Sequence, residues 1–278
     1  MLDRIKTMLG ELGAQAAGVA SGVRERLEPH LYETLSTKIR PTELAALMTR
    51  ALGIKRRRFE SGYGVFDIDP VSNFGFRLFK DGVYEPETIE LLERCLGAGD
   101  TFVDLGANEG YFSVLASRLV GHGQVFAIEP QRRCWPVIVQ NLADNDCANV
   151  TLVPYGVARE ACTFELVLTP PTNTGASSFV ASRRGSLWPR QTVHALPLDE
   201  ILARYSVGEV ALMKVDIEGY ELEALESAGE ALASGRIHNL IVEVHPRQLA
   251  ELGRDPGDVQ RILEGHGYQR RGEVLYSR

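Results

Sequence analysis

The sequence predicts an α/β protein with a mostly parallel, doubly wound sheet, an inserted β-meander and a helical N-terminal extension. From Thr101 onward, short apolar strands alternate with segments of helical spacing, which is typical of a parallel sheet covered by helices. That alternation breaks over residues 161–195 and then resumes, so we expect an insertion there. The first forty residues instead repeat apolar positions at three-four spacing, which indicates one helical stripe.

Composition limits the classes of function. A chain of 278 residues fits one large domain, or one domain with an appendage. The net charge of −7 argues against a nucleic-acid partner, because phosphate binding usually requires a basic face. Four scattered cysteines without C-x-x-C pairs favour a reducing compartment. The sequence has no signal-peptide pattern and no stretch long enough to span a bilayer, so we expect a cytoplasmic protein.

Residues 1–60 are expected to form the N-terminal extension. Its apolar stripe comprises Leu2, Ile5, Leu9, Leu12, Ala16, Val19 and Val23. Several glycines weaken this helix, so we expect it to dock against the body, a substrate or a second subunit in a homo-oligomer. Thr42 is a candidate N-cap for a helix over residues 43–52, which Gly53 would end. The basic run at residues 55–58 is interpreted as a solvated connector.

Residues 61–278 are expected to form the main domain, with a β-hairpin and a helix over residues 62–97 and the core over residues 98–278. The stretches "YGVFDIDP" and "FGFRLF" alternate apolar and polar residues around a turn, which predicts the hairpin. A helix then follows from Pro86.

The core elements follow from the same patterns. Strands are expected at 101–105, 124–129, 150–155, 162–169, 192–196, 210–217, 238–245 and 273–277, and helices at 109–119, 132–145, 198–205, 220–232 and 256–267. Pro136 must then lie in the first turns of its helix.

The turn after the first core strand has the pattern D-x-G-x-N-x-G, with Asp104, Gly106, Asn108 and Gly110. Together with Ala107 it is a candidate cofactor-binding loop, because ligands of doubly wound sheets bind at the carboxyl ends of strands. A dinucleotide fingerprint would place a third glycine at Ser113. A carboxylate here repels a pyrophosphate but attracts a cation, which favours S-adenosylmethionine over NAD.

The second core strand ends at Glu129, where an acid commonly binds ribose hydroxyls. A ribose is common to both cofactors, so Glu129 supports a nucleoside without choosing between them. Trp135 could cover an adenine ring, although a core position is the plainer interpretation.

Seven motifs in order resemble the FkbM-type methyltransferases: "GVYEPET", "GDTFVDLGANEGYFS", "VFAIEP", "TNTGASSF", "LPLDEIL", "LMKVDIEGYELEAL" and "LIVEVHP". The resemblance covers about residues 62–246. It implies the class I methyltransferase (Rossmann-like) fold and methyl transfer from S-adenosylmethionine, usually to a hydroxyl of a sugar or small natural product. It also implies a lid over the methionine end at Tyr84 and Glu85, which could equally be a helix start.

Three side chains follow the later strands and are catalytic candidates: Asp216, Glu218 and His245. Each could accept the proton of a hydroxyl acceptor. Asp216 is also a candidate for cofactor binding, or it could simply pair with Lys214. A magnesium site at these three residues is conceivable, but nothing in their spacing demands a metal, and none is predicted.

Two alternatives remain open from the sequence: an NAD-dependent oxidoreductase, and a non-catalytic binding or scaffold protein on a methyltransferase fold. After the fourth core strand the chain reads "DIEG", not the Pro-Pro-aromatic turn typical of nucleobase methylation. The polar loop Asn173–Ser178 could bind the acceptor or be a plain surface loop. The partner is expected to be a small molecule or glycan whose identity the sequence does not give.

Overall fold

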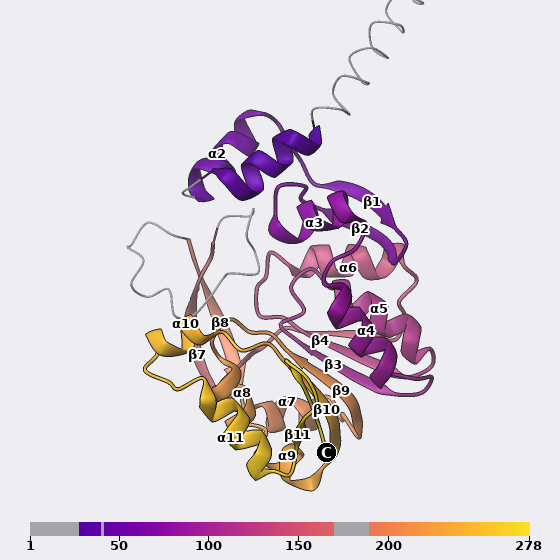
Figure 1. The fold of residues 1–278 in the computed structure, drawn as a ribbon, viewed down its shortest axis with the longest axis vertical. Helices are drawn as coiled ribbons and strands as arrows, with labels where there is room; N and C mark the ends of the chain where they lie inside the picture. Colours follow the sequence, from indigo (N-terminus) through magenta and orange to yellow (C-terminus); the bar gives the residue numbers. More distant parts are fainter. Residues whose placement is uncertain (1–27, 40–41, 170–188) are drawn as a thin grey trace, which may run out of the picture.

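A computed structural model of the chain describes residues 28–39, 42–169 and 189–278. Its centre is a seven-stranded sheet in the order β11-β12-β10-β9-β3-β4-β5 (Figure 1). Five neighbouring strands are parallel: β10 (Ile237–Val242), β9 (Val210–Val215), β3 (Thr101–Leu105), β4 (Gln124–Ile128) and β5 (Val150–Val153). Two short antiparallel strands complete one edge: β12 (Leu275–Ser277) and β11 (Gln269–Arg270).

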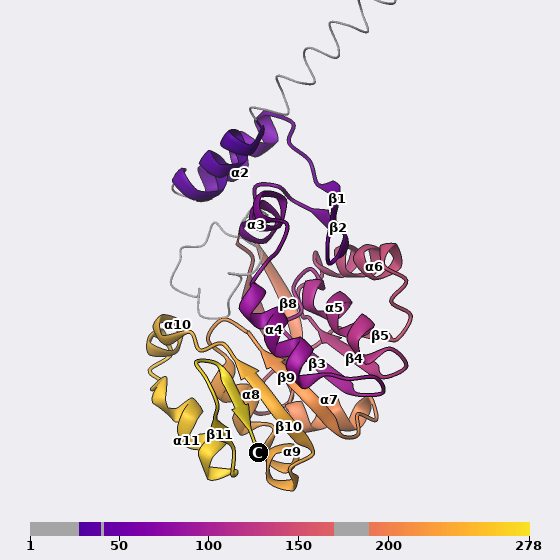
Figure 2. The same ribbon diagram turned by 45° about the vertical axis from the view of Figure 1, so that its right-hand side comes forward.

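Helices cover both faces of this sheet (Figure 1, Figure 2). The helices on one face are α4 (Pro86–Cys95), α5 (Tyr111–Val120) and α6 (Trp135–Asp144), and those on the other are α7 (Leu198–Arg204), α8 (Glu221–Glu226), α9 (Gly229–Ser234) and α11 (Gly257–Gly265). Phe102 packs into the core beneath α4, α5 and α6, and Val103 packs into the core on the opposite face of the sheet, because side chains alternate between the two faces along a strand. The predicted doubly wound α/β fold is therefore confirmed.

The strand order reverses between β3 and β9. From β3 the chain moves outward through β4 to β5, and it returns to β9 on the other side of β3 before continuing to β10. The carboxyl ends of β3 and β9 consequently lie side by side, with Leu105 opposite Val215 and Asp104 opposite Lys214. Such a switch point is where doubly wound sheets bind ligands.

Most predicted core elements are confirmed, with small differences at their ends. Pro136 lies in the first turn of α6, where a missing N–H leaves no broken helical hydrogen bond. The predicted helix at 220–232 is two helices, α8 and α9. The sequence prediction omitted a short helix, α10 (Pro246–Glu251), which directly follows His245.

The inserted meander is a separate three-stranded sheet in the order β6-β8-β7, formed by β6 (Gly156–Val157), β7 (Cys162–Val167) and β8 (Arg190–Leu196). The antiparallel pairing of β7 with β8 agrees with the predicted meander. The acceptor-loop candidate Asn173–Ser178 lies outside the described residues.

The hairpin predicted over residues 62–79 is wrong in its second half. β2 (Gly64–Ile68) pairs backward with β1 (Arg57–Ser61), and "FGFRLF" belongs to helix α3 (Asn73–Asp81). The Ser72 hydroxyl caps α3 by accepting from the Gly75 N–H at 2.9 Å, and Gly82 ends it in the left-handed conformation. The alternating aromatic residues were a misleading strand signal, because Phe74 and Leu78 lie four residues apart and pack into the same core from one face of a capped helix.

The N-terminal segment packs against the body near α3. Residues 28–33 are helical and continue into the π-helix η1 (Thr34–Lys38). Tyr32 and Leu35 share a small core with Val71 and Phe76. α2 (Thr42–Ala51) agrees with the helix predicted over 43–52, and the proposed domain division at residue 60 falls within β1. The stripe over Leu2–Val23 lies outside the described residues.

Candidate active site

The loop after β3 is shaped by glycine at a point of close backbone approach. Gly106 has φ 92°, and a Cβ on it would lie 2.0 Å from the carbonyl oxygen of Asp216. The N–H groups of Gly106 and Ala107 both donate to the Ile128 carbonyl, at 3.0 and 3.1 Å. Gly110, with φ 79°, precedes α5. The loop therefore lies close against the ends of β4 and β9, and a larger residue at Gly106 would displace it.

Asp104 is buried beneath this loop, with its side chain on the α5 face of the sheet. Its Oδ2 accepts a hydrogen bond from the Ser113 hydroxyl at 2.6 Å. Its Oδ1 is buried and has no hydrogen-bond partner among the described residues. Burial raises the pKa of Asp104, and the nearby charge of Lys214 lowers it in part. An orphaned buried acceptor is costly unless a ligand donor satisfies it, so this position fits a cationic or hydrogen-bonding group.

Glu129 lies at the end of β4 and is also buried. Its Oε2 accepts from the Asn108 N–H and its Oε1 from the Gln131 N–H, each at 2.8 Å. Burial raises the pKa of Glu129 to about 7, although these two hydrogen bonds lower it. Each carboxylate oxygen keeps a second lone pair for a ligand hydroxyl. The Trp135 indole donates to the Glu129 carbonyl at 2.8 Å.

A buried lysine, Lys214, lies near the carboxyl end of β9, opposite Asp104 of β3. Lys214 Nζ is 2.7 Å from Asp216 Oδ2 and 5.0 Å from the centroid of the Phe112 ring. Burial lowers the pKa of Lys214, but Asp216 and Asp104 more than offset that effect and raise it overall. The sequence-based alternative that Asp216 pairs with Lys214 is therefore realised. Beyond this pairing, no role for Lys214 was expected from the sequence.

His245, at the carboxyl end of β10, is held by a buried carboxylate. Its Nδ1 lies 2.8 Å from Oε1 of Glu221, whose side chain is 0% exposed. Its Nε2 faces three carboxylate oxygens, from Glu218 at 3.7 Å, Asp216 at 3.8 Å and Glu243 at 3.9 Å. Burial lowers the pKa of His245, but the hydrogen bond to Glu221 and the surrounding acids raise it to about 9.

Glu221 was not among the site residues expected from the sequence, and only its position in space reveals it. It begins α8 and resembles an ordinary acid of a first helical turn. Its Oε1 also accepts from the Gly219 N–H at 2.8 Å, and its Oε2 is buried without a partner among the described residues. The candidate Glu218 has φ 51° and accepts from Gln248 at 2.8 Å. Burial raises the pKa of Glu218.

Tyr84 and Glu85 lie before α4, beside the same strand ends. The Tyr84 ring meets Phe74 edge-on, with 5.2 Å between the ring centroids, and burial raises the pKa of its hydroxyl. Glu85 adopts φ 47° and its carboxylate does not cap α4, although the Thr88 hydroxyl reaches it at 3.3 Å. Glu85 thus stands at the start of a helix, as the helix-start alternative predicts, but its carboxylate accepts no capping hydrogen bond.

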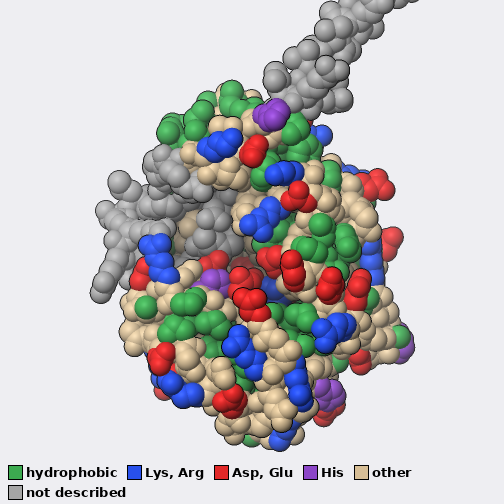
Figure 3. Space-filling model, viewed as in Figure 1, with side chains coloured by type: hydrophobic (Ala, Val, Ile, Leu, Met, Phe, Trp, Pro, Cys, Tyr) green, Lys and Arg blue, Asp and Glu red, His purple; other side chains and the backbone are tan. Residues whose placement is uncertain are grey.

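Acidic side chains gather with a histidine at the hollow in the middle of one face (Figure 3). One potential ligand atom each from Asp216, Glu243 and His245 lies within 4.8 Å of the others. This set differs from the one considered in the sequence, because Glu243 replaces Glu218. Lys214 already balances part of the charge of Asp216.

Comparisons with known proteins agree with this geometry. The model of the methyltransferase FkbM domain matches residues 104–270. The chain belongs to this family. It is therefore an S-adenosylmethionine-dependent methyltransferase, and both the family resemblance and the cofactor expected from the sequence are confirmed.

Two curated relatives are named methyltransferases. Hexuronic acid methyltransferase AglP of Haloferax volcanii is 28% identical over 179 residues, which is 64% of this chain and 67% of that protein. Methyltransferase sdnD of Sordaria araneosa is 28% identical over 169 residues, covering 51% of this chain and 64% of the relative. The chain thus matches about two thirds of each relative's length.

Solved structures with similar folds include an S-adenosylmethionine-dependent O-methyltransferase from Thermotoga maritima. It is 14% identical, with a TM-score of 0.43 and coverage of 78% of this chain and 72% of that one. Another is Aeropyrum pernix fibrillarin in complex with S-adenosylmethionine, at 13% identity, with a TM-score of 0.40 and coverage of 69% of this chain and 73% of that one.

Within the described ranges, none of the helices has the length and apolar character needed to cross a membrane.

Proposed function

We propose that the cofactor binds across the carboxyl ends of β3 and β4, in contact with the loop Gly106–Gly110. Glu129 would accept the ribose hydroxyls through its remaining lone pairs. Asp104, whose Oδ1 has no partner among the described residues, would satisfy a donor of the methionine end directly or through water. Tyr84, Glu85 and Asp216 would border that end, because the Tyr84 N–H donates to the hydroxyl of Tyr111 at the start of α5 at 3.4 Å and the Asp216 N–H donates to the Leu105 carbonyl at the end of β3 at 3.0 Å.

We further propose that the reaction is O-methylation of a hydroxyl. The bound cofactor supplies an electrophilic methyl group. The observation that carries this proposal is the pairing of His245 with the buried Glu221 at 2.8 Å, because it fixes one ring nitrogen and leaves the other facing the strand ends. His245 Nε2 would accept the hydroxyl proton in the neutral form of the ring, which becomes the main form only as the pH rises through about 9, and Glu221 would hold the ring and stabilise the imidazolium that results.

The other two catalytic candidates fit different roles. Asp216 is engaged by Lys214, and Glu218 by Gln248. The Lys214 cation stabilises the charged form of Asp216, and the hydrogen bond from the neutral Gln248 amide does the same for Glu218, so each carboxylate is a weaker base than it would be without its partner. We therefore assign proton transfer to His245, and we assign Asp216 and Glu218 to orientation of the ligands.

The acceptor is proposed to be a neutral hydroxyl of a sugar, glycan or small natural product. The relative from Haloferax volcanii is named for a hexuronic acid. In this chain, Asp216, Glu218 and Glu243 surround His245 Nε2 within 4 Å. Such an arrangement repels an anionic acceptor and tolerates a neutral one.

Calorimetry with S-adenosylhomocysteine tests the cofactor site. We expect wild-type protein to bind, and Asp104→Ala to bind at least about tenfold more weakly, a loss of about 1.4 kcal/mol. Glu90→Ala, which removes an exposed acid on α4, should bind as wild type does. Undiminished binding by Asp104→Ala would contradict the assignment.

Mass spectrometry with isotopically labelled S-adenosylmethionine and a panel of glycans and metabolites tests the reaction. The expected product carries a new methyl ether. His245→Asn should lose most of this activity while binding S-adenosylhomocysteine with the wild-type affinity. A methylamine or thioether product, or full activity of His245→Asn, would overturn the proposal.

A further inference from the structure

A glutamate inside the cofactor loop is buried and paired with an arginine from far outside it. Glu109, between Asn108 and Gly110, has a side chain that is only 2% exposed. Arg56 binds both of its oxygens, Nη1 to Oε1 at 3.0 Å and Nη2 to Oε2 at 2.7 Å. A planar guanidinium that meets a carboxylate at two points fixes direction as well as distance.

The same guanidinium holds strand β2. Arg56 Nε donates to Oδ2 of Asp67 at 2.8 Å, and its Nη2 donates to the Asp67 carbonyl. The prediction that residues 55–58 form a solvated connector is therefore wrong for Arg56. Arg56 also precedes the part of the chain that the family model matches, which begins at residue 104. An element ahead of the family domain is thus joined directly to the loop of the proposed cofactor site.

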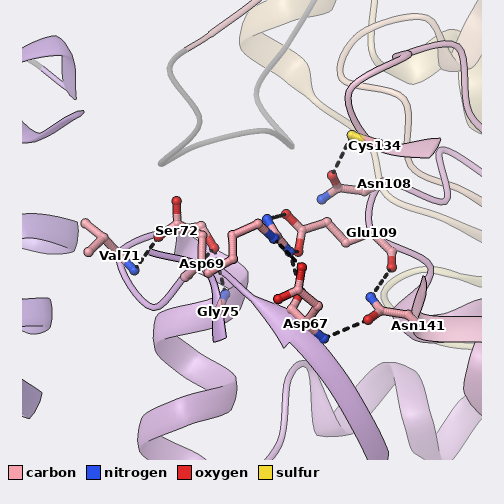
Figure 4. Close-up of polar contacts among 10 residues, drawn as sticks. Asp67, Asp69, Val71, Ser72, Gly75, Asn108, Glu109, Cys134 and Asn141 are labelled. Atoms are coloured by element: carbon pink, nitrogen blue, oxygen red, sulfur yellow. Dashed lines mark hydrogen bonds and ion pairs between the residues drawn. The ribbon is translucent and has the colours of Figure 1, made fainter. Parts of the chain in front are cut away.

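A second bridge runs parallel to the first. Asn141 on α6 donates from Nδ2 to the Glu109 carbonyl at 2.8 Å, and its Oδ1 accepts from the Asp67 N–H at 2.7 Å. Figure 4 shows Glu109, Asp67 and Asn141 converging from the loop, β2 and α6. The side chain and the main chain of Glu109 are therefore both tied to Asp67, one through Arg56 and the other through Asn141.

The position of Glu109 in the chain connects this pairing to the cofactor. The preceding residue, Asn108, has φ 50° and donates its N–H to Glu129 Oε2 at 2.8 Å. Asparagine tolerates this left-handed conformation better than most non-glycine residues, and here contacts on both sides of the peptide hold Asn108 in it. With Glu109 held from the β2 side and Asn108 bound to Glu129, the Asn108 N–H keeps its direction toward the proposed ribose-binding acid.

We propose that Arg56 is a positioning residue for the cofactor. It holds Glu109, and through Glu109 it keeps the cofactor loop in its binding conformation, so the β1–β2 hairpin is part of the cofactor site. This inference rests on the proposed cofactor site. Without the guanidinium, Glu109 would be a buried carboxylate without a counter-charge. Either the loop would open so that water could hydrate the carboxylate, or the carboxylate would take up a proton.

Calorimetry with S-adenosylhomocysteine on the full chain tests the inference. We expect Arg56→Ala to raise Kd at least about tenfold and Arg56→Lys, which keeps the charge but loses the planar two-point contact, to raise it by an intermediate factor. Thermal unfolding of the cofactor-free variants shows whether each variant is folded. If Arg56→Ala does not fold, the Kd of Arg56→Lys tests the inference instead.

Arg118→Ala is the matched control. Arg118 on α5 donates to the Tyr63 carbonyl at 2.6 Å and to Asn145 Oδ1 at 2.7 Å, so it holds the same hairpin without contacting the loop. We expect it to lower the unfolding temperature while leaving Kd within about twofold of wild type. Wild-type Kd in Arg56→Ala, or equal weakening by Arg118→Ala and Arg56→Ala, would overturn the inference. Failure of the wild-type protein to bind would instead refute the proposed cofactor site.

Discussion

The Glu221–His245 pair yields a prediction that does not require knowledge of the acceptor. Replacing Glu221 with Gln removes the buried negative charge that lies 2.8 Å from His245 Nδ1. The pKa of His245, raised to about 9 by its carboxylate neighbours against the effect of burial, should then fall. We expect a decrease of at least about one unit, because burial persists and still favours the neutral ring.

The size and the sign of the effect on the free energy of unfolding follow from the linkage between proton binding and folding. A rise from 6.5 to about 9 corresponds to about 3 kcal/mol, at about 1.4 kcal/mol per unit. Because the pKa is raised in the folded state, this stabilisation is fully present below about pH 6.5 and is lost as the pH rises through about 9. Wild-type protein should therefore lose stability across that window, and Glu221→Gln should lose less of it.

Two measurements check this prediction. Proton–carbon NMR of the six histidine rings gives the pKa of His245 once His245→Asn has identified its signal. Urea unfolding between about pH 6 and 10 gives the linked change in free energy. Glu209→Gln, which alters the exposed pair of His238 with Glu209, is the control and should leave the His245 titration unchanged. A wild-type His245 that titrates near 6.5, or one unaffected by Glu221→Gln, would refute the reasoning.

Three further predictions concern the loop, a metal and a helix. Gly106→Ala should weaken S-adenosylhomocysteine binding at least about tenfold in calorimetry, because its Cβ would meet the Asp216 carbonyl; unchanged Kd would contradict the close approach. Chelation with EDTA should leave methyl transfer unchanged, because Lys214 already balances part of the charge of Asp216; a loss restored by magnesium would disprove this. Ser72→Ala should cost about 1 kcal/mol in urea unfolding, as the loss of an N-cap does, and an unchanged midpoint would refute the cap.

The sequence alone predicted the doubly wound fold and the cofactor. Apolar residues repeat with a different period in strands and in helices, so the alternation of strands and helices after Thr101 could be recognised without a structure. The position of Asp104 ahead of Gly106 favoured a cationic ligand, and the family match agrees with that choice. These are local patterns, and each can be recognised within a few residues of the chain.

Only the tertiary structure showed the contacts between residues that lie far apart in the sequence. Residues 73–81 form a helix where aromatic alternation predicted a strand, because Phe74 and Leu78, four residues apart, pack into the same core and Ser72 caps the first turn. Glu221 is a plain first-turn acid in the sequence, and Arg56 is one cation in a basic run. Folding buries Glu221 beside His245 and brings Arg56 to Glu109, 53 positions further along the chain. Their proposed roles depend on desolvation and on partners distant in sequence, so only the packed chain could reveal them.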